Sequence, residues 1–165
     1  MFYEPTKFEF VNILESNWIW IKQELLQLQP DNFRPWLEKS AYGKGWDIFP
    51  LYLFERKINK NCLLCPETDK ILESIPGVAS ACFSCLAPKT SVHPHVGQSN
   101  SILRCHLGLI VPNGCDIRVG NETRSWQEGK CLVFEDTVEH EAWNQGDIPR
   151  FILLVDFKKD NFYEI

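Results

Sequence analysis

The stretch that decides the fold is ILRCHLGLIV, residues 102–111. Apolar side chains occupy every second position from Leu103 to Leu109, and the polar Arg104 and His106 fall between them. Because alternate residues of an extended strand share a face, the run predicts a strand with one apolar face and one face that carries both polar residues. A cation and an imidazole among apolar neighbours suit an anion site inside a β-barrel, whereas a solvated polar face is the simpler interpretation.

The same two-residue period recurs through the C-terminal half of the chain. In the run at residues 150–157, Arg150 shares a face with Ile152 and Leu154, while the other face is apolar. Turn sequences such as Pro112-Asn113-Gly114 separate the runs. The pattern predicts a mainly β fold, an antiparallel jelly roll, with strands at residues 78–86, 102–111, 116–119, 130–134 and 150–157.

The first part of the chain follows a helical period instead. Thr6 and Glu9 have the spacing of a capping box, and apolar residues then recur at helical spacing until Pro30. We therefore predict one amphipathic helix, residues 7–28, packed on the outside of the sheet. Residues 31–70 combine proline, glycine and aromatic residues, which indicates short strands and loops, with a small helix at residues 65–74.

Composition limits the class of protein. The 165 residues fit one domain, residues 1–165, and a hydrophobic fraction of 44% is typical of a folded protein. A net charge of −5 with scattered acidic residues argues against a nucleic-acid partner. No apolar stretch approaches the roughly 18 residues of a spanning helix, so we expect no transmembrane segment. The N-terminus does not resemble a secretory signal, and seven cysteines, an odd number, indicate a reduced, cytoplasmic chain.

Four of the cysteines have the spacing of a zinc ribbon. Cys62 and Cys65 form one pair, Cys82 and Cys85 form the second, and 16 residues lie between the pairs. The second pair lies in a predicted strand, where residues three apart face opposite sides. Four buried thiols are therefore the favoured interpretation, and a noncatalytic zinc-binding domain is an alternative.

Two histidines give the chain its candidate chemistry. His95 and His140 lie 45 positions apart and bracket the stretch at residues 102–111. Non-heme Fe(II) oxygenases hold iron with His-x-Asp/Glu and a distant histidine, and they leave positions open for co-substrate and oxygen. Here Gly97 occupies the carboxylate position. From the residues alone, the pattern indicates an iron site without its usual third ligand.

Several motifs in one order resemble the aspartyl/asparaginyl β-hydroxylase family. The resemblance covers about residues 75–157, and two further motifs, YGKGW at 42–46 and CPET at 65–68, are similar to the N-terminal part of the family. The motifs that carry it are Ser84, HPHVG at 93–97, Asn100, LRCHLGL at 103–109, WQEGK at 126–130 and FEDTVEHEAWN at 134–144.

The resemblance implies a double-stranded β-helix that uses Fe(II), 2-oxoglutarate and O2. It implies that His95 and His140 hold iron, with water in place of the carboxylate, because the Pro-His-x-Gly match falls on His95 rather than on His93. It places Arg150 and Ser84 at the distal carboxylate of 2-oxoglutarate, and Arg104 with His106 near the carboxylate beside the metal. Arginine suits these positions because its guanidinium binds carboxylates in a bidentate manner.

The implied reaction is hydroxylation of an unactivated C–H bond, coupled to decarboxylation of 2-oxoglutarate to succinate. We expect the β-carbon of an Asp or Asn residue, or of a related amino acid, as the target, and a soluble small-molecule or peptide substrate rather than a membrane lipid. One alternative is a cupin-type metalloenzyme that uses His93, His95 and His140 without 2-oxoglutarate. Another is a binding domain that keeps the barrel without the chemistry.

Overall fold

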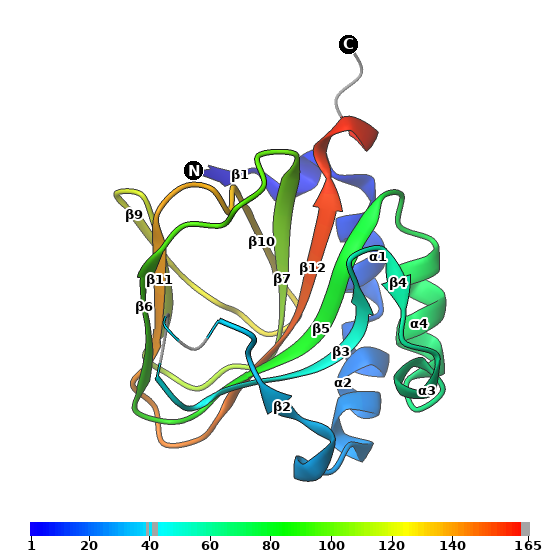
Figure 1. The fold of residues 1–165 in the computed structure, drawn as a ribbon, viewed down its shortest axis with the longest axis horizontal. Helices are drawn as coiled ribbons and strands as arrows, with labels where there is room; N and C mark the ends of the chain where they lie inside the picture. The colour runs from blue at the N-terminus through cyan, green and yellow to red at the C-terminus, as the bar shows by residue number, and fades with distance from the viewer. Residues whose placement is uncertain (39, 41–42, 163–165) are drawn as a thin grey trace.

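Two antiparallel sheets face each other in the computed structural model, which describes residues 1–38, 40 and 43–162 (Figure 1). Tyr42, the first residue of the YGKGW motif, lies outside the described residues. The larger sheet has the order β1-β10-β7-β12-β5-β3-β2, with β4 paired to β3. Its strands are β1 (Phe2–Tyr3), β2 (Arg34–Pro35), β3 (Trp46–Leu53), β4 (Arg56–Lys57), β5 (Val78–Leu86), β7 (Ile102–Ile110), β10 (Cys131–Phe134) and β12 (Arg150–Lys158).

The smaller sheet has the order β6-β11-β8-β9. Its strands are β6 (Thr90–His95), β8 (Cys115–Val119), β9 (Glu122–Ser125) and β11 (His140–Asn144). From β5 to β12 the chain passes repeatedly from one sheet to the other, so strands distant in sequence become neighbours. This winding is a double-stranded β-helix, and it confirms the predicted jelly-roll fold.

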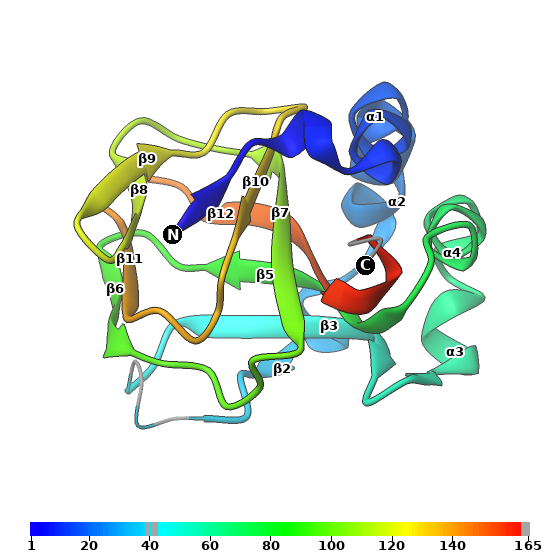
Figure 2. The same ribbon diagram turned by 90° about the horizontal axis from the view of Figure 1, so that it is seen from above.

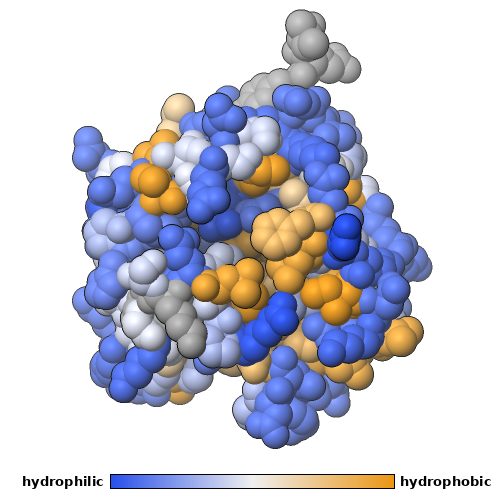
Figure 3. Space-filling view, in the orientation of Figure 1, coloured by the Kyte–Doolittle hydropathy of each residue, from blue (hydrophilic) through white to orange (hydrophobic). Residues whose placement is uncertain are grey.

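Helices cover the outer face of the larger sheet and leave its inner face to the smaller sheet (Figure 2). The helices are α1 (Glu9–Ser16), α2 (Trp18–Gln27), α3 (Asn59–Cys62) and α4 (Pro66–Glu73), with 3-10 turns η1 (Pro5–Lys7), η2 (Pro30–Asn32) and η4 (Lys159–Asn161). Within the described residues, no helix has the length and apolarity needed to cross a bilayer. Apolar side chains on the face drawn in Figure 3 form separate patches among hydrophilic ones.

The predicted helix at residues 7–28 is interrupted. It divides at Asn17, whose side-chain amide donates to the Ile13 carbonyl at 2.8 Å and competes with the backbone bonds that would continue the helix. The predicted capping box is wrong, because Phe8 precedes α1 and makes no side-chain cap, while Thr6 lies in η1. The predicted small helix at residues 65–74 is present as α4.

The five predicted strands are present with small shifts at their ends. β2, β3 and β4 lie within residues 31–70, where short strands were predicted without bounds, and β1, β6, β9 and β11 were not predicted. β3 and β6 each contain a proline, which makes them hard to recognise as strands from composition. Pro50 lies in β3 at a register shift against β5, and Pro94 lies in β6, an edge strand of the smaller sheet. Bulges and edges are the positions where a strand tolerates a proline, because the missing N–H is not needed there.

The alternation of side chains divides the larger sheet into two chemically different faces. Leu103, Cys105 and Leu107 of β7 pack outward in one apolar cluster with the helices. Ile152 and Leu154 of β12 pack inward with residues of the smaller sheet. Arg104, His106 and Arg150 point to the inner side and are 9%, 6% and 3% exposed. The predicted parity is therefore confirmed, and the solvated polar face is wrong.

The zinc-ribbon cysteines do not gather. Cys82 belongs to the cluster between the sheets, whereas Cys62 and Cys65 belong to the cluster under the helices. Cys85 lines a groove with residues of α2. In the part of the chain that the structure describes, no group of three or more His, Cys, Asp or Glu side chains is arranged to hold a metal ion. The described residues therefore do not form a zinc ribbon.

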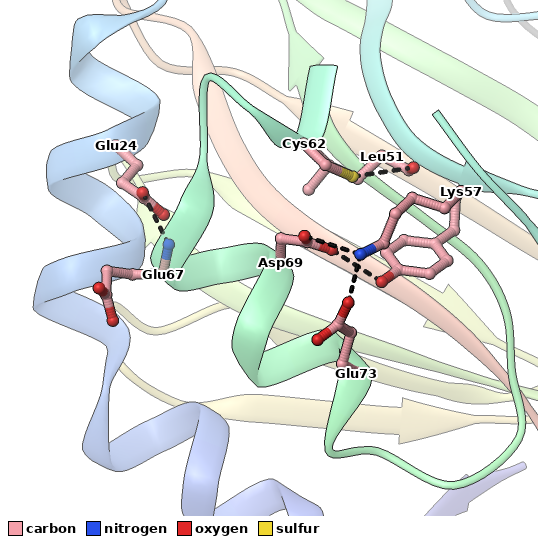
Figure 4. Close-up of polar contacts among 8 residues, drawn as sticks. Glu24, Leu51, Lys57, Cys62, Glu67, Asp69 and Glu73 are labelled. Atoms are coloured by element: carbon pink, nitrogen blue, oxygen red, sulfur yellow. Dashed lines mark hydrogen bonds and ion pairs between the residues drawn. The ribbon is translucent and has the colours of Figure 1, made fainter. Parts of the chain in front are cut away.

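A carboxylate on α2 fixes the outer helices to each other (Figure 4). Glu24 accepts hydrogen bonds from the backbone N–H groups of Glu67 and Thr68, at 3.0 and 2.7 Å, and from the Thr68 hydroxyl at 2.7 Å. These N–H groups belong to the first turn of α4, where no residue of the turn supplies a side-chain cap. Glu24 therefore caps α4 from another helix, with its charge near the positive end of the helix dipole.

Replacing Glu24 should loosen this layer without touching the space between the sheets. We expect Glu24→Ala to lower the free energy of unfolding by about 1–2 kcal/mol, because the first turn of α4 loses its acceptors. Urea denaturation measures the change, and Glu38→Ala, at an exposed position, is the matched control. Equal stability of the two variants would show that the cap contributes little.

Candidate active site

A cavity between the two sheets collects the six residues that the family resemblance nominated for iron and 2-oxoglutarate. It is lined by His95 and His140 from the smaller sheet, and by Ser84, Arg104, His106 and Arg150 from the larger sheet. Apolar residues such as Ile152 and Leu154 fill the wall between them. The structure thus brings together six side chains that are spread over residues 84–150.

His95 and His140 are neighbours on adjacent strands of the smaller sheet. They are direct partners in the register of β6 and β11, and their ring centroids lie 4.3 Å apart. Nδ1 of His95 lies 2.8 Å from the His93 carbonyl, and Nδ1 of His140 lies 2.8 Å from the Val138 carbonyl. A carbonyl only accepts, so each Nδ1 carries the proton and each Nε2 presents a lone pair, as a metal ligand requires.

His93 does not join this pair. The register of β6 shifts between the partners of His140 and Ala142, so that His95 and Val92, three positions apart, both line the cavity. Such a bulge changes the direction of a side chain, and His93 is exposed. A three-histidine centre with His93 therefore has no support in the described residues, in agreement with the absence of a metal-binding group of three there.

Asp136 occupies the space that Gly97 leaves. A Cβ built on Gly97 would overlap the Asp136 carboxylate, and the Gly97 N–H donates to the Asp136 carbonyl at 2.8 Å. Oδ1 of Asp136 lies 3.4 Å from Nε2 of His140. A carboxylate thus lies beside the histidine pair, although it comes from the connection between β10 and β11 and not from position 97. Asp136 belongs to the FEDTVEHEAWN motif, four residues before His140, and together with Glu139 it was the carboxylate that could have replaced water as a third metal ligand.

Arg104 is already engaged with protein carboxylates. Its Nε and Nη2 donate to the two oxygens of Asp156 at 2.7 and 2.9 Å, and its Nη1 lies 2.7 Å from Asp136. Burial alone would lower the pKa of Arg104, but Asp156 and Asp136 outweigh it and raise the pKa above its ordinary value. Asp156 thus occupies the bidentate fork in this structure, and the expected role of Arg104 with His106 near the carboxylate beside the metal stays a prediction.

Arg150 is in the opposite situation. Its Nη2 donates to the Ser84 hydroxyl at 2.9 Å, and its Nε has no hydrogen-bond partner among the described residues. Burial lowers the pKa of Arg150 to about 10, because the charged guanidinium is removed from water. Trp46 Nε1 also donates to Ser84, at 2.9 Å, so both acceptor positions of the hydroxyl are used and its proton is left to donate. This end of the cavity is suited to an anion.

An aromatic wall connects the histidines to the first strand. The Phe134 ring packs against His106 and His140, with centroid separations of 5.0 and 5.4 Å. Phe2 of β1 packs edge-on against Phe134 at 5.9 Å. The two-residue strand at the start of the chain therefore supports the side chains that line the cavity.

The contact between Gly97 and Asp136 predicts a specific coupling. We expect Gly97→Ala to lower the free energy of unfolding by about 1–3 kcal/mol, because the new methyl group displaces the Asp136 carboxylate from Arg104. In an Asp136→Ala background the same substitution should cost much less. A double-mutant cycle in urea measures the coupling. Additive effects would mean that the two residues do not compete for this space.

The buried imidazole of His140 predicts a pH dependence. Burial lowers its pKa from 6.5 to about 4. The unfolded chain then binds this proton more readily than the fold does, so the free energy of unfolding decreases as the pH falls from 6.5 toward 4 and no further below that. Between pH 7 and 4.5, metal-free wild-type protein should lose about 2 kcal/mol more than His140→Gln in urea denaturation. His93→Gln, which changes an exposed histidine, should follow the wild type.

Comparison with known proteins identifies relatives of this chain. The chain is 46% identical over 117 residues to the ornithine lipid ester-linked acyl 2-hydroxylase of Rhizobium tropici, a match that covers 69% of this chain and 42% of that protein. It is 38% identical over 157 residues to the human aspartyl/asparaginyl beta-hydroxylase, covering 90% of this chain and 21% of that protein. The chain thus spans less than half the length of these relatives.

A solved structure shows the same fold. The plu4264 protein from Photorhabdus luminescens superposes with a TM-score of 0.52 at 13% identity, over 82% of this chain and 91% of that one. The family model described as Aspartyl/Asparaginyl beta-hydroxylase matches residues 15–160. This chain therefore belongs to the aspartyl/asparaginyl β-hydroxylase family.

Proposed function

We propose that this protein is an Fe(II)- and 2-oxoglutarate-dependent hydroxylase. The observation that carries the proposal is the pairing, in one cavity, of two imidazole lone pairs with a buried arginine that has no carboxylate partner among the described residues. His95 and His140 would hold the iron. When bound, iron with 2-oxoglutarate and O2 supplies the oxidising power that hydroxylates a C–H bond while 2-oxoglutarate becomes succinate.

The residues of the cavity suit the two ends of 2-oxoglutarate differently. Arg150 offers Nε–H and Ser84 offers its hydroxyl proton, two donors for the distal carboxylate. His106 lies two residues from Arg104 and contacts the same Phe134 ring as His140, which supports a role at the carboxylate nearer the metal. Arg104 would act there through its ion pair with Asp136, which holds that carboxylate beside His140.

A test of co-substrate dependence distinguishes the proposal from its alternatives. Anaerobically prepared protein with Fe(II) should bind 2-oxoglutarate in a calorimetric titration and convert it to succinate when oxygen is admitted. His95→Ala and His140→Ala should each lower turnover by roughly 100-fold or more, because ligand loss exceeds the 10–100-fold effect of losing a supporting group. His93→Ala is the matched control and should retain turnover close to wild type.

Other outcomes would assign a different function. Turnover without 2-oxoglutarate, or loss of activity only in His93→Ala, would indicate the cupin-type enzyme. Failure to bind both Fe(II) and 2-oxoglutarate would indicate a binding domain without chemistry.

We further propose an amino-acid substrate, with the β-carbon of an Asp or Asn residue as the target. The relatives include an aspartyl/asparaginyl beta-hydroxylase and an ornithine lipid ester-linked acyl 2-hydroxylase, so a screen needs both substrate classes. Addition of one oxygen atom to an Asp- or Asn-containing peptide, detected by mass spectrometry, would support the proposal. Addition to an acyl chain alone would overturn it.

All seven cysteines are free, which supports our proposal of a reducing, cytoplasmic location.

A further inference from the structure

Trp126 lies in the cavity wall and belongs to none of the groups assigned so far. It is 3% exposed and sits in the connection between β9 and β10. That connection packs against β7 at Gly108. The Gly129 N–H donates to the Gly108 carbonyl at 2.9 Å, and the Gly108 N–H donates to the Lys130 carbonyl at 3.0 Å. A Cβ on Gly108 would overlap the Gln127 carbonyl. Because Gly108 lies two residues after His106, this close approach brings Trp126 next to that imidazole.

The indole N–H determines where His106 carries its proton. Nε1 of Trp126 lies 3.2 Å from Nδ1 of His106. An indole nitrogen only donates, so Nδ1 of a neutral His106 must accept and the ring proton must be on Nε2. Burial, together with the charges of Arg104 and Arg150, keeps the pKa of His106 well below its usual value, so the ring is neutral. Its Nε2 is buried and has no hydrogen-bond partner within the described residues.

The same indole ring also supports Arg150. The guanidinium carbon of Arg150 lies 4.5 Å from the centroid of the Trp126 ring, a cation–π contact in a buried setting. Nη2 of Arg150 is fixed by Ser84, and its Nε remains without a partner. One side chain therefore orients two separate donors on the cavity wall.

His106 is the reverse of the two candidate iron ligands. His95 and His140 face backbone carbonyls with Nδ1, and this leaves a lone pair on Nε2. His106 faces an N–H donor with Nδ1, and this leaves an N–H on Nε2. We propose that Trp126 is a positioning residue that makes His106 a hydrogen-bond donor for a carboxylate rather than a third metal ligand, and that holds Arg150 ready for the same dicarboxylate. The assignment of the ligand as 2-oxoglutarate rests on the proposed function.

Nitrogen NMR of metal-free protein labelled with 15N-histidine tests the tautomers directly. Wild type should show the proton of His106 on Nε2, and the protons of His95 and His140 on Nδ1. In Trp126→Phe, which keeps an aromatic ring and loses the donor, His106 should shift toward a mixture of both tautomers. Trp143→Phe is the matched control, because Trp143 Nε1 donates at the same distance of 3.2 Å to Asp116, away from His106.

Calorimetric titration of 2-oxoglutarate into the Fe(II)-loaded protein without oxygen tests the consequence. Affinity should fall roughly 10-fold or more in Trp126→Phe, as expected for one hydrogen bond to a charged group, and further in Trp126→Leu, which also loses the ring under Arg150. Trp143→Phe should bind like wild type. Thermal unfolding of each variant confirms that it is folded.

A wild-type His106 with its proton on Nδ1 would overturn the inference, and this reading needs no variant. Unchanged tautomer and affinity in Trp126→Phe would also overturn it. If wild type shows the expected tautomers but binds no 2-oxoglutarate, the proposed function and the ligand role of His106 fail, while the positioning of His106 by Trp126 stands.

Discussion

The constraint on which this structure depends is the alternation of side chains across the larger sheet. Every second residue of β7 and β12 faces the helices and is apolar, so burying that face fixes the direction of the residues between them. Arg104, His106 and Arg150 are consequently forced into the space between the sheets. A shift of one residue in register would exchange the two sets, and the cavity and the outer core would be lost together.

Inside the cavity, the two arginines show how differently one side chain can be used. Arg104 is paired with the carboxylates of Asp156 and Asp136. Within the part of the chain that the structure describes, Arg150 has a hydroxyl and an aromatic ring as partners and no carboxylate, so its buried charge is not balanced there. An unpaired buried charge destabilises a folded protein, so its presence here points to an anionic ligand that pairs with the guanidinium. Histidine shows the same division, because the group that faces Nδ1 decides what Nε2 can do.

Local pattern was sufficient to predict much of the fold. The two-residue period identified β5, β7, β8, β10 and β12 and the face on which Arg104 and Arg150 lie, because burial on one side imposes that period. It did not identify β3 or β6, where proline at a bulge or an edge interrupts the usual composition. It also joined α1 to α2 across Asn17, since helical spacing continues through a break that a single side-chain hydrogen bond produces.

The candidate site was predictable only as a set of residues. Motifs nominated His95, His140, Ser84, Arg104, His106 and Arg150, and the fold collects them in one cavity. Their partners were not predictable, because Asp156 meets Arg104 across 52 residues and Trp126 meets His106 through a loop held at Gly108. Contacts of this kind depend on strand register and on the close packing of distant segments, and a short stretch of sequence carries no information about either. The occupation of Gly97's space by Asp136 is of the same kind.

The packing of Phe2 against Phe134 determines how far the N-terminus can be shortened without disturbing the cavity. The family model begins its match at residue 15, yet the wall behind His106 and His140 is completed by a strand at residues 2–3. That strand also covers the free edge of β10. A fragment that begins at residue 15 would keep all six cavity residues but expose the unpaired edge of β10 beside them. An exposed edge can pair with other chains, so such a fragment should aggregate, and its cavity should be distorted.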